Sequence, residues 1–401
     1  YRKPLTLVLN PSHRRYSLQL LIASGAVTSR ISYPIPLQPT VINLFTLVCL
    51  HVKRGLPQQH SHDMYAKIAA IAPFLPPEIL SNESLASHFS GTSAEEIYRL
   101  SGIRNRHIAA SEVTPSDLAF EAAQNLFDQH PEHDRKSVDA ILFCSEGLDY
   151  KAPATACLLH HRLNLAINCL AMDIPGGCTG FVNGLLVAKS LIAQNRQIRT
   201  VLLLTAETVT KVLHDDDLHL RMLFGDGACA TLLTQSDTSH IGDFILGTDG
   251  SGQNALWVER SGFRNPADTQ WLESHQHTTH GMRYGRLLMQ GDSLLHFALK
   301  RVPDLVHDTL LANNLGSIED IDLFIFHQAS LIILKYLKRK IKIENKKFFV
   351  CLEEQGNTVS SSIPIALDSA LKKGAISSGN KVMLVGFGVG LSWAATVVDV
   401  V

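Results

Sequence analysis

The stretch NCLAMDIPGGCTGFVNGLLVAKSLIAQNRQIRTVLLLTAE (residues 168–207) predicts a strand, a glycine-containing turn, a helix and a second strand. The same order recurs in NKKFFVCLEEQGNTVSSSIPIALDSALKKGAISSGNKVMLVGFG (residues 345–388). A similarity over this length, far apart in one chain, indicates that a single structural unit occurs twice.

The segments that precede these two stretches match as well. A helical pattern over residues 115–130 leads into SVDAILFCSEG (137–147), and one over residues 294–311 leads into DIDLFIFHQAS (320–330). Strands that alternate with helices are typical of an α/β fold with buried strands. We therefore expect a duplicated α/β fold whose pseudo-twofold axis brings the two glycine-containing turns together.

The first 63 residues differ in character from the remainder. They show no sustained helical or alternating period, and the first 62 contain seven Lys or Arg but no Asp or Glu. We expect residues 1–63 to be an N-terminal extension outside the fold, either upstream sequence, a transit peptide or, as a third alternative, a structured extension. The remainder then divides into an N-terminal half, residues 64–236, and a C-terminal half, residues 237–401.

Composition excludes several classes of protein. The 401 residues are 45% hydrophobic and 18% charged, which argues against intrinsic disorder and coiled coil. After residue 62 the chain has 29 basic and 37 acidic residues, and this excess of negative charge argues against a nucleic-acid partner. The apolar run at residues 41–50 is about half of the roughly 20 residues that a membrane span needs. Seven cysteines without a CxxC pair indicate a reduced, cytoplasmic protein.

Cys178 is the candidate nucleophile among the seven cysteines. It follows two glycines in IPGGCTGF and precedes a helical pattern that is apolar on nearly all sides and is expected to be buried. A thiol at a helix N-terminus lies near the positive end of the helix dipole, which favours the thiolate. The other six cysteines lie in apolar runs and are expected to be core residues.

His327 and Asn357 occupy the corresponding region of the second half. His327 ends the apolar run LFIF, at the edge where α/β sheets present active residues, and Asn357 lies in QGNT, at the place that Cys178 has in the first half. A cysteine nucleophile needs a partner that handles protons or stabilises charge. The duplication is expected to bring this histidine and this amide to the same pole as Cys178.

The glycine-rich run GFGVG (residues 386–390) follows the last long strand of the second half. Its backbone N–H groups are candidates, together with that of Cys178, for an oxyanion hole. A tight turn that needs unusual φ angles is the alternative, and the two are compatible. The run is not a dinucleotide-binding fingerprint, because strand character resumes over residues 391–401.

Two polar clusters have simpler explanations. The spacing of His275, His277 and His280 suggests a metal site, but without supporting Cys or carboxylate ligands a solvated loop is favoured, and no metal is expected. The run Asp215 to Asp217 precedes Leu218 and indicates a helix cap.

From Met64 onward the chain resembles the β-ketoacyl-acyl-carrier-protein synthase III family, condensing enzymes of the thiolase superfamily. The matching segments are SGIRNRHIA (101–109), DIPGGCTGF around Cys178, RMLFGDGA (221–228), FHQAS with His327, QGNTVSSSIPIALDSA with Asn357, and GFGVGLSW. The resemblance implies a homodimer of five-layered αβαβα subunits. Thiolases would add a second catalytic cysteine near the C-terminal glycines, and elongating synthases use two histidines, so both fit less well.

The resemblance also implies a decarboxylative Claisen condensation. Cys178 would accept the acyl group of a primer thioester, with the backbone N–H groups of Cys178 and Val389 binding the oxyanion. His327 and Asn357 would hold the carbonyl of a malonyl thioester on a carrier protein while carbon dioxide leaves. The product would be a β-ketoacyl thioester for fatty-acid initiation or natural-product biosynthesis, and no cofactor is expected.

Phe224 and Gly388 are expected to contact the substrate. By the resemblance, Phe224 would reach into the acyl pocket of the partner subunit and gate it, and Gly388 lies in the glycine-rich run. Two other functions stay open: a cysteine acyltransferase or thioester hydrolase on the same fold, and a non-catalytic partner subunit. The presence of Cys178, His327 and Asn357 together disfavours the last.

The sequence departs from the family at one place. Members that start from acyl-CoA carry a tryptophan and an arginine that grip the CoA, and the aligned residues here are Glu96 and Leu100. A carboxylate at a phosphate-rich rim is unfavourable. We therefore expect an acyl group on a carrier protein or a specialised primer, whereas Arg99 and Arg104 would compensate if the donor is a CoA thioester. The segment 249–283 is also long for the family and is expected to reshape the tunnel mouth.

Overall fold

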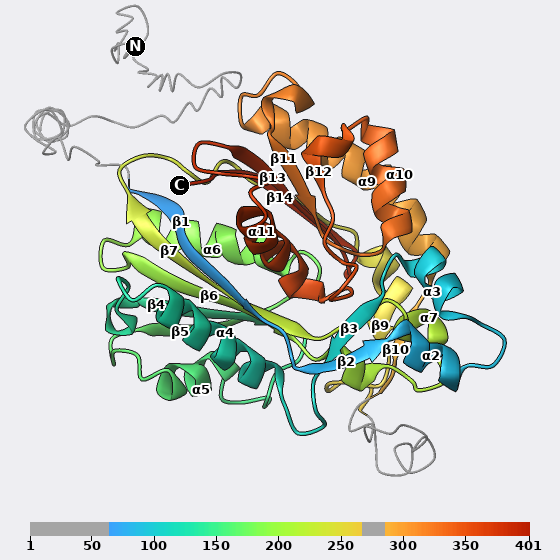
Figure 1. Ribbon diagram of the computed structural model, residues 1–401. Helices are drawn as coiled ribbons and strands as arrows, with labels where there is room; N and C mark the ends of the chain where they lie inside the picture. Colours follow the sequence, from blue (N-terminus) through green and yellow to red (C-terminus); the bar gives the residue numbers. More distant parts are fainter. Residues whose placement is uncertain (1–63, 267–284) are drawn as a thin grey trace, which may run out of the picture. The chain divides into compact units, whose positions relative to one another are not determined.

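The computed structural model describes residues 64–266 and 285–401, and this part of the chain belongs to one compact unit, Asp63–Val401 (Figure 1). The proposed extension, residues 1–63, and the three histidines at 275–280 lie outside the described residues. No helix in the described ranges is long and apolar enough to cross a membrane.

Each half contributes the same succession of elements. In the first half these are β1 (Tyr65–Phe74), α4 (Pro115–Gln129), β4 (Ala140–Ser145), α5 (Thr155–Arg162), β5 (Leu170–Pro175), α6 (Gly180–Gln194), β6 (Thr200–Glu207) and β7 (Gly227–Ser236). In the second half they are β8 (Ile245–Thr248), α9 (Gly291–Ala312), β11 (Leu323–Phe326), α10 (Leu331–Ile341), β12 (Phe348–Phe349), α11 (Ser362–Lys372), β13 (Lys381–Gly388) and β14 (Ser392–Asp399). The elements predicted around residues 115–147 and 294–330 are confirmed.

The two five-stranded sheets share one topology. Their strand orders are β1-β7-β6-β4-β5 and β8-β14-β13-β11-β12. In the first sheet β4 runs parallel to β5 and β6, while β7 is antiparallel to β6 and β1. In the second sheet β11 runs parallel to β12 and β13, while β14 is antiparallel to β13 and β8. This equivalence supports the division that we propose between residues 236 and 237.

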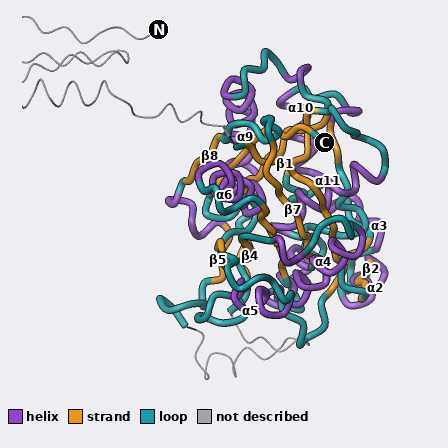
Figure 2. The backbone as a smooth tube through the Cα atoms, turned by 90° about the vertical axis from the view of Figure 1, so that its left-hand side faces the viewer, coloured by secondary structure: helices purple, strands orange, loops and turns teal. Residues whose placement is uncertain are grey.

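The sheets and helices alternate in five layers. Helices α4 and α5 cover the outer face of the first sheet, α6 and α11 lie between the sheets and contact both, and α9 covers the second sheet with α10 against it. In Figure 2, α9 and α10 lie at the top and α5 at the bottom, with strands between them. The predicted five-layered αβαβα fold is therefore confirmed.

Local sequence explains where the site-bearing helices begin. Helix α4 starts with Pro115 after a capping box formed by Thr114 and Asp117. Helix α6 carries an almost wholly apolar sequence and is buried between the sheets, as its pattern predicted. The helix begins at Gly180, so Cys178 lies two residues before it instead of starting it.

Smaller elements surround the pole where the second-half strands β11 and β13 end. They are β2 (Glu78–Ser81), α2 (Asn82–His88), α3 (Ala94–Ser101), β3 (Asn105–Ile108), α7 (Leu218–Arg221), β9 (Leu256–Val258) and β10 (Leu287–Met289), with the single-turn helices η2 (Val209–Val212) and η6 (Val359–Ser361). Asp217 caps α7 by accepting a hydrogen bond from the backbone N–H of Leu220, which confirms the predicted cap.

Candidate active site

Cys178 lies in the short connection between β5 and α6. The residue is 5% exposed, and Thr179, which follows it, is the N-cap of α6. The connection approaches the first sheet closely, because a methyl group on Gly180 would lie 2.4 Å from the Sγ atom of Cys144. Glycine at position 180 therefore allows the connection that carries Cys178 to approach Cys144 of β4.

The turn between β13 and β14 covers the sulfur atom from the other half of the chain. A Cβ atom on Gly388 would lie 2.4 Å from Sγ of Cys178, so this close approach requires glycine. The backbone N–H of Val389 forms a hydrogen bond to the same sulfur. The hydroxyl of Ser392 donates to the carbonyl of Val389 at 2.7 Å and fixes the turn.

The charge state of Cys178 differs from the expectation based on the helix dipole. Burial, and after it the nearby carboxyl groups of Glu146 and Glu207, raise the pKa of the Cys178 thiol to about 12. The backbone N–H groups of Val389 and Cys178 act in the opposite direction. The effect of the helix N-terminus is therefore outweighed by burial, and the thiol form prevails at neutral pH.

His327 directly follows β11, as the sequence predicted. It is 2% exposed, and its backbone N–H donates to the carbonyl of Val385 at 2.8 Å. Its Nδ1 atom lies 2.7 Å from the hydroxyl of Ser362, and its ring packs edge-on against Phe387. Burial lowers the pKa of His327 to about 3, partly offset by a hydrogen bond with the backbone of Val359. The imidazole is consequently neutral and able to accept a proton.

Asn357 is fixed by hydrogen bonds on both its backbone and its side chain. Its N–H donates to the carbonyl of Leu223 at 2.8 Å, and its carbonyl accepts from the N–H of Gly225 at 3.1 Å. Its Nδ2 atom donates to the carbonyl of Ala329 at 3.3 Å, while its Oδ1 atom accepts from the N–H of Val359 at 2.9 Å. The amide is 5% exposed and held in one orientation.

Val359 connects the three residues that the sequence singled out. It belongs to the same buried apolar cluster as Cys178, and its backbone bonds both His327 and the side chain of Asn357. Its φ angle of 50° is unusual for a β-branched residue, and such strain persists where the surrounding structure fixes it. The structure thus brings Cys178, His327 and Asn357 into one site.

Phe224 lies beside this site within its own subunit. It pairs with Asn357 in an isolated parallel bridge, is 5% exposed, and belongs to the apolar cluster of Cys178. These contacts place Phe224 next to Asn357 and Cys178 of its own chain, and its reach into a partner subunit stays a prediction. Its other side borders a cavity of about 220 Å³, with Leu213 and Arg221 among the neighbours. Phe224 consequently separates this cavity from the surroundings of Cys178.

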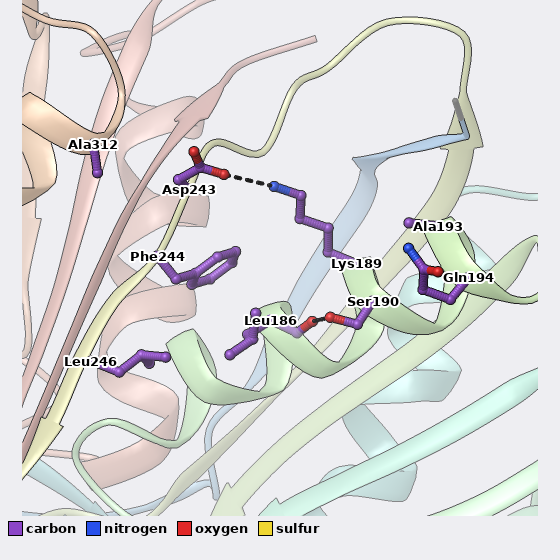
Figure 3. A pocket seen from close by; sticks show the side chains of 9 residues that line it. All are labelled: Leu186, Lys189, Ser190, Ala193, Gln194, Asp243, Phe244, Leu246 and Ala312. Atoms are coloured by element: carbon purple, nitrogen blue, oxygen red, sulfur yellow. Dashed lines mark hydrogen bonds and ion pairs between the residues drawn. The ribbon is translucent and has the colours of Figure 1, made fainter. Parts of the chain in front are cut away.

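A larger hollow of about 570 Å³ lies at the opposite end of α6 and includes none of these residues (Figure 3). Lys189 lies at its edge, donates a hydrogen bond to the carbonyl of Gly242 at 2.8 Å, and approaches Asp243 to 3.9 Å. The hydroxyl of Ser190 in its lining donates to the carbonyl of Leu186 at 2.8 Å. The hollow contains none of the residues of the candidate site and does not belong to it.

The remaining cysteines differ partly from the prediction. Cys144, Cys229 and Cys351 are buried, but Cys157 is exposed and Cys169 is half-buried. The core prediction is therefore wrong for Cys157, which projects from the outer helix α5. Its apolar neighbours in the sequence did not reveal that it lies on the outward face of the helix. No group of metal-ligating side chains occurs in the ranges that the structure describes.

Sequence reasoning missed two glutamates beneath Cys178. Glu146 directly follows β4 and Glu207 ends β6, which are neighbouring parallel strands. The C-terminal ends of parallel strands meet at one edge of a sheet, so the segments FCSEG and LTAE contained the necessary signal.

The doubled sheet, the five layers and the cysteine before a buried central helix define a protein with a thiolase-like fold. The family model for 3-oxoacyl-[acyl-carrier-protein] synthase III matches residues 172–250, and the model for its C-terminal part matches residues 311–400. The β-ketoacyl-[acyl-carrier-protein] synthase III of Caldanaerobacter subterraneus is 34% identical over 338 residues, which cover 83% of this chain and 97% of that protein. The chain belongs to the 3-oxoacyl-[acyl-carrier-protein] synthase III family.

Solved structures agree with this assignment. A crystal structure of a 3-oxoacyl-(acyl-carrier-protein) synthase III is 40% identical, with a TM-score of 0.78 over 84% of this chain and 99% of that one. The priming β-ketosynthase of the R1128 polyketide biosynthetic pathway is 26% identical, with a TM-score of 0.74 over 84% of this chain and 96% of that one. Both fatty-acid and polyketide synthases therefore occur among the relatives.

Proposed function

We propose that this condensing enzyme extends an acyl primer on Cys178 with a malonyl thioester, releasing carbon dioxide and a β-ketoacyl thioester, in fatty-acid initiation or natural-product biosynthesis. The observation that carries the proposal is the meeting of both halves at one sulfur atom. The turn at Gly388 and Val389 lies against Cys178, and Val359 links His327 and Asn357 to it.

The first step transfers the primer to the cysteine. As the Cys178 sulfur bonds to the thioester carbonyl its proton becomes acidic and passes to the imidazole of His327, which gives it to the sulfur of the primer's carrier as the bond from carbon to that sulfur breaks and the carrier leaves as a thiol. The backbone N–H groups of Cys178 and Val389 are placed to stabilise the oxyanion that forms on the way. Because the resting thiol is protonated, we expect acylation to need this proton transfer.

The second step forms the carbon–carbon bond. The malonyl carboxylate leaves as carbon dioxide, and the electron pair of the broken bond becomes an enolate, which His327 and Asn357 stabilise as hydrogen-bond donors. The enolate carbon attacks the acyl group on Cys178, the bond from carbon to sulfur breaks, and the thiolate takes up a proton. A pKa of about 3 keeps His327 neutral in this step, so its ring N–H serves as a hydrogen-bond donor and the proton on the thiolate comes from solvent.

The rim formed by α3 supports a carrier-bound primer more than a CoA thioester. Glu96 is paired with Arg99 at 3.6 Å, and Leu100 lies in an apolar cluster with Ile97. Arg104 is held by Glu353 at 2.8 Å. Both arginines that could compensate for the missing CoA-gripping side chains are thus already paired with glutamates, which disfavours the phosphates of CoA.

Helix α10 offers a surface for an acidic carrier protein. The helix begins at Leu331, four residues after His327, and its exposed face combines Ile332 and Tyr336 with Lys335 and Arg339. Its eleven residues include no acidic side chain. Apolar anchors flanked by positive charge suit an acidic partner that must deliver a thioester nearby.

We also propose that the enzyme is a homodimer joined along β5. This strand is the edge of the first sheet, and its outer side leaves Leu170 41% exposed and Met172 and Ile174 half-buried. An unpaired edge with apolar side chains is a template for another strand, and a second copy related by a twofold axis satisfies both edges at once.

The function is tested by labelling and by product mass. The protein is incubated with a radiolabelled acyl-carrier protein, and one sample is digested to locate the label. A second, undigested sample then receives malonyl-carrier protein. We expect label on the Cys178 peptide, release of carbon dioxide and a product longer by two carbons. Cys178→Ala should abolish all three, whereas Cys157→Ser, at an exposed cysteine on α5, should retain them. Labelling followed by release of the unextended acid would identify a thioester hydrolase instead.

A further inference from the structure

Two carboxyl groups lie directly beneath the connection that carries the nucleophile. The carboxyl of Glu146 lies against the backbone of Gly177, where an added methyl group would be 2.5 Å from its Oε1 atom. Glu207 is 3% exposed and accepts hydrogen bonds from the backbone N–H of Glu146 at 3.2 Å and from the hydroxyl of Ser360 at 2.8 Å. Glu207 is buried, and Glu146 is an exposed residue whose carboxyl lies against the backbone next to Cys178. The reaction proposed above uses neither carboxyl, so their place beside Cys178 needs another explanation.

Within residues 64–266 and 285–401, no cation compensates these two acids. The groups that face them are Cys144 at the end of β4, the hydroxyl of Ser145, which lies 3.3 Å from Glu207, the hydroxyl of Ser360 on η6, and Cys178 before α6. Among the described residues, no Lys, Arg or His contributes to the electrostatics of either carboxyl. Two unpaired carboxylates in such surroundings repel one another, and retaining protons is the usual resolution.

The direction of the electrostatic effects agrees with this geometry. Glu146 as a residue is exposed, but its carboxyl lies against the backbone of Gly177, and burial at the carboxyl raises its pKa to about 7. Burial and the neighbouring Glu146 raise the pKa of Glu207 far above its usual range. Each carboxyl, once ionised, also raises the pKa of Cys178, and Glu146 has the larger effect.

We propose that Glu146 and Glu207 form a proton-holding pair that controls how readily Cys178 ionises. While the pair is fully protonated it is neutral, and the thiol loses its proton to His327 without opposition from a nearby negative charge. When Glu146 ionises, its charge disfavours the thiolate, and acylation slows relative to a protein without that charge. The pair acts on the nucleophile through the electric field and does not contact the substrate, so both are positioning residues.

The test measures the rate at which iodoacetamide alkylates Cys178 as a function of pH, by mass spectrometry of the Cys178 peptide. Glu146→Gln should react like the unmodified protein at about pH 6, where Glu146 is already neutral. Above about pH 8 it should react at least about threefold faster, which corresponds to half a unit of pKa at Cys178. A purely structural role for Glu146 would change the rate by the same factor at every pH.

Glu207→Gln provides a second, independent readout. Glu207 keeps its proton while Glu146 ionises, so a neutral glutamine at position 207 should leave the onset of the Glu146→Gln effect at nearly the same pH. An onset that moves by more than about one pH unit would contradict the assignment of the titration to Glu146. Glu121→Gln on the exposed face of α4 is the matched control and should leave the profile unchanged. Circular dichroism checks that each variant is folded, and Glu146→Gln, at a partly exposed residue, carries the test even if Glu207→Gln does not fold.

The inference rests on the proposed function only in taking Cys178 as the nucleophile. Alkylation requires no acyl or malonyl substrate, so a failure of condensation leaves this test intact. The decisive quantity is the alkylation rate of the Glu146→Gln variant divided by that of the unmodified protein. If this ratio is the same at about pH 6 and at about pH 9, the proposal is overturned, whatever the reaction proves to be.

Discussion

Gly388 has no side chain, and this allows the turn between β13 and β14 to lie against the sulfur of Cys178. Gly388→Ala places a methyl group 2.4 Å from the Cys178 sulfur, so the turn or the cysteine must move. We expect the acylation rate to fall about 100-fold, since misplacing a reacting group by about 1 Å has this effect. Thermal unfolding should show a loss of about 1–3 kcal/mol from overpacking.

The control for this substitution is Gly374→Ala. Gly374 has a φ of 66°, and an added Cβ there meets nothing within 4 Å. It therefore reports the cost of a positive φ without a clash at the site. Equal effects of the two substitutions on acylation would contradict the role assigned to the contact between Gly388 and Cys178.

The residues differ in how far the sequence revealed them. Cys178, His327 and Asn357 were predictable because each lies at an element end in a repeated pattern, and the repeat relates their positions. The raised pKa of Cys178 was not predictable, because it depends on burial and on Glu146 and Glu207, which approach it only after the strands assemble. The same reason applies to the bridge between Phe224 and Asn357, which is a tertiary contact that the sequence does not reveal.

At the scale of elements, α10 makes a prediction about carrier recognition. Lys335→Glu combined with Arg339→Glu reverses the charge of its exposed face. We expect the KM for malonyl-carrier protein to rise about 10-fold or more, the effect of roughly 1.4 kcal/mol, while kcat with a small malonyl thioester stays unchanged. Arg196→Glu, an exposed charge in the loop after α6, is the control and should behave like the unmodified enzyme. A loss of kcat with both substrates would argue against a docking role.

Strand β5 makes a prediction about assembly. Met172→Lys puts a charge at the half-buried outer edge of the first sheet, and charge at an edge strand opposes pairing with another strand. Light scattering after gel filtration should show that the mass falls from dimer to monomer. Leu311→Lys, at a 61% exposed position on α9, should leave the mass unchanged. A monomeric unmodified protein would contradict the proposed dimer.

At the scale of the whole molecule, the chemistry is confined to one compact unit. Every residue that builds the described site lies between Cys144 and Ser392, inside the unit Asp63–Val401. We therefore expect deletion of residues 1–63 to leave the condensation rate and the unfolding temperature unchanged. A folded truncated protein that has lost turnover would show that the extension takes part in the reaction.

The fold as a whole was predictable because the same order of strands and helices occurs in both halves of the sequence. Each half has a hydrophobic run, which forms β4 or β11, and an apolar helix, α6 or α11. The elements predicted for one half could therefore be compared with those predicted for the other. The short elements around the pole, such as β2 and β9, occur without a repeated counterpart and carry weak patterns. Their placement depends on contacts with the two sheets, which the sequence alone does not specify.

The connection between the halves at Cys178 has a consequence for the integrity of the enzyme. The first half supplies the sulfur, and the second supplies the turn above it and the amide and imidazole beside it. A fragment of either half, such as a product of proteolysis or of interrupted synthesis, therefore retains an incomplete set of reacting groups. Catalytic turnover therefore requires that both halves of the chain are folded and joined. The measured activity of a sample is then also a measure of its completely folded fraction.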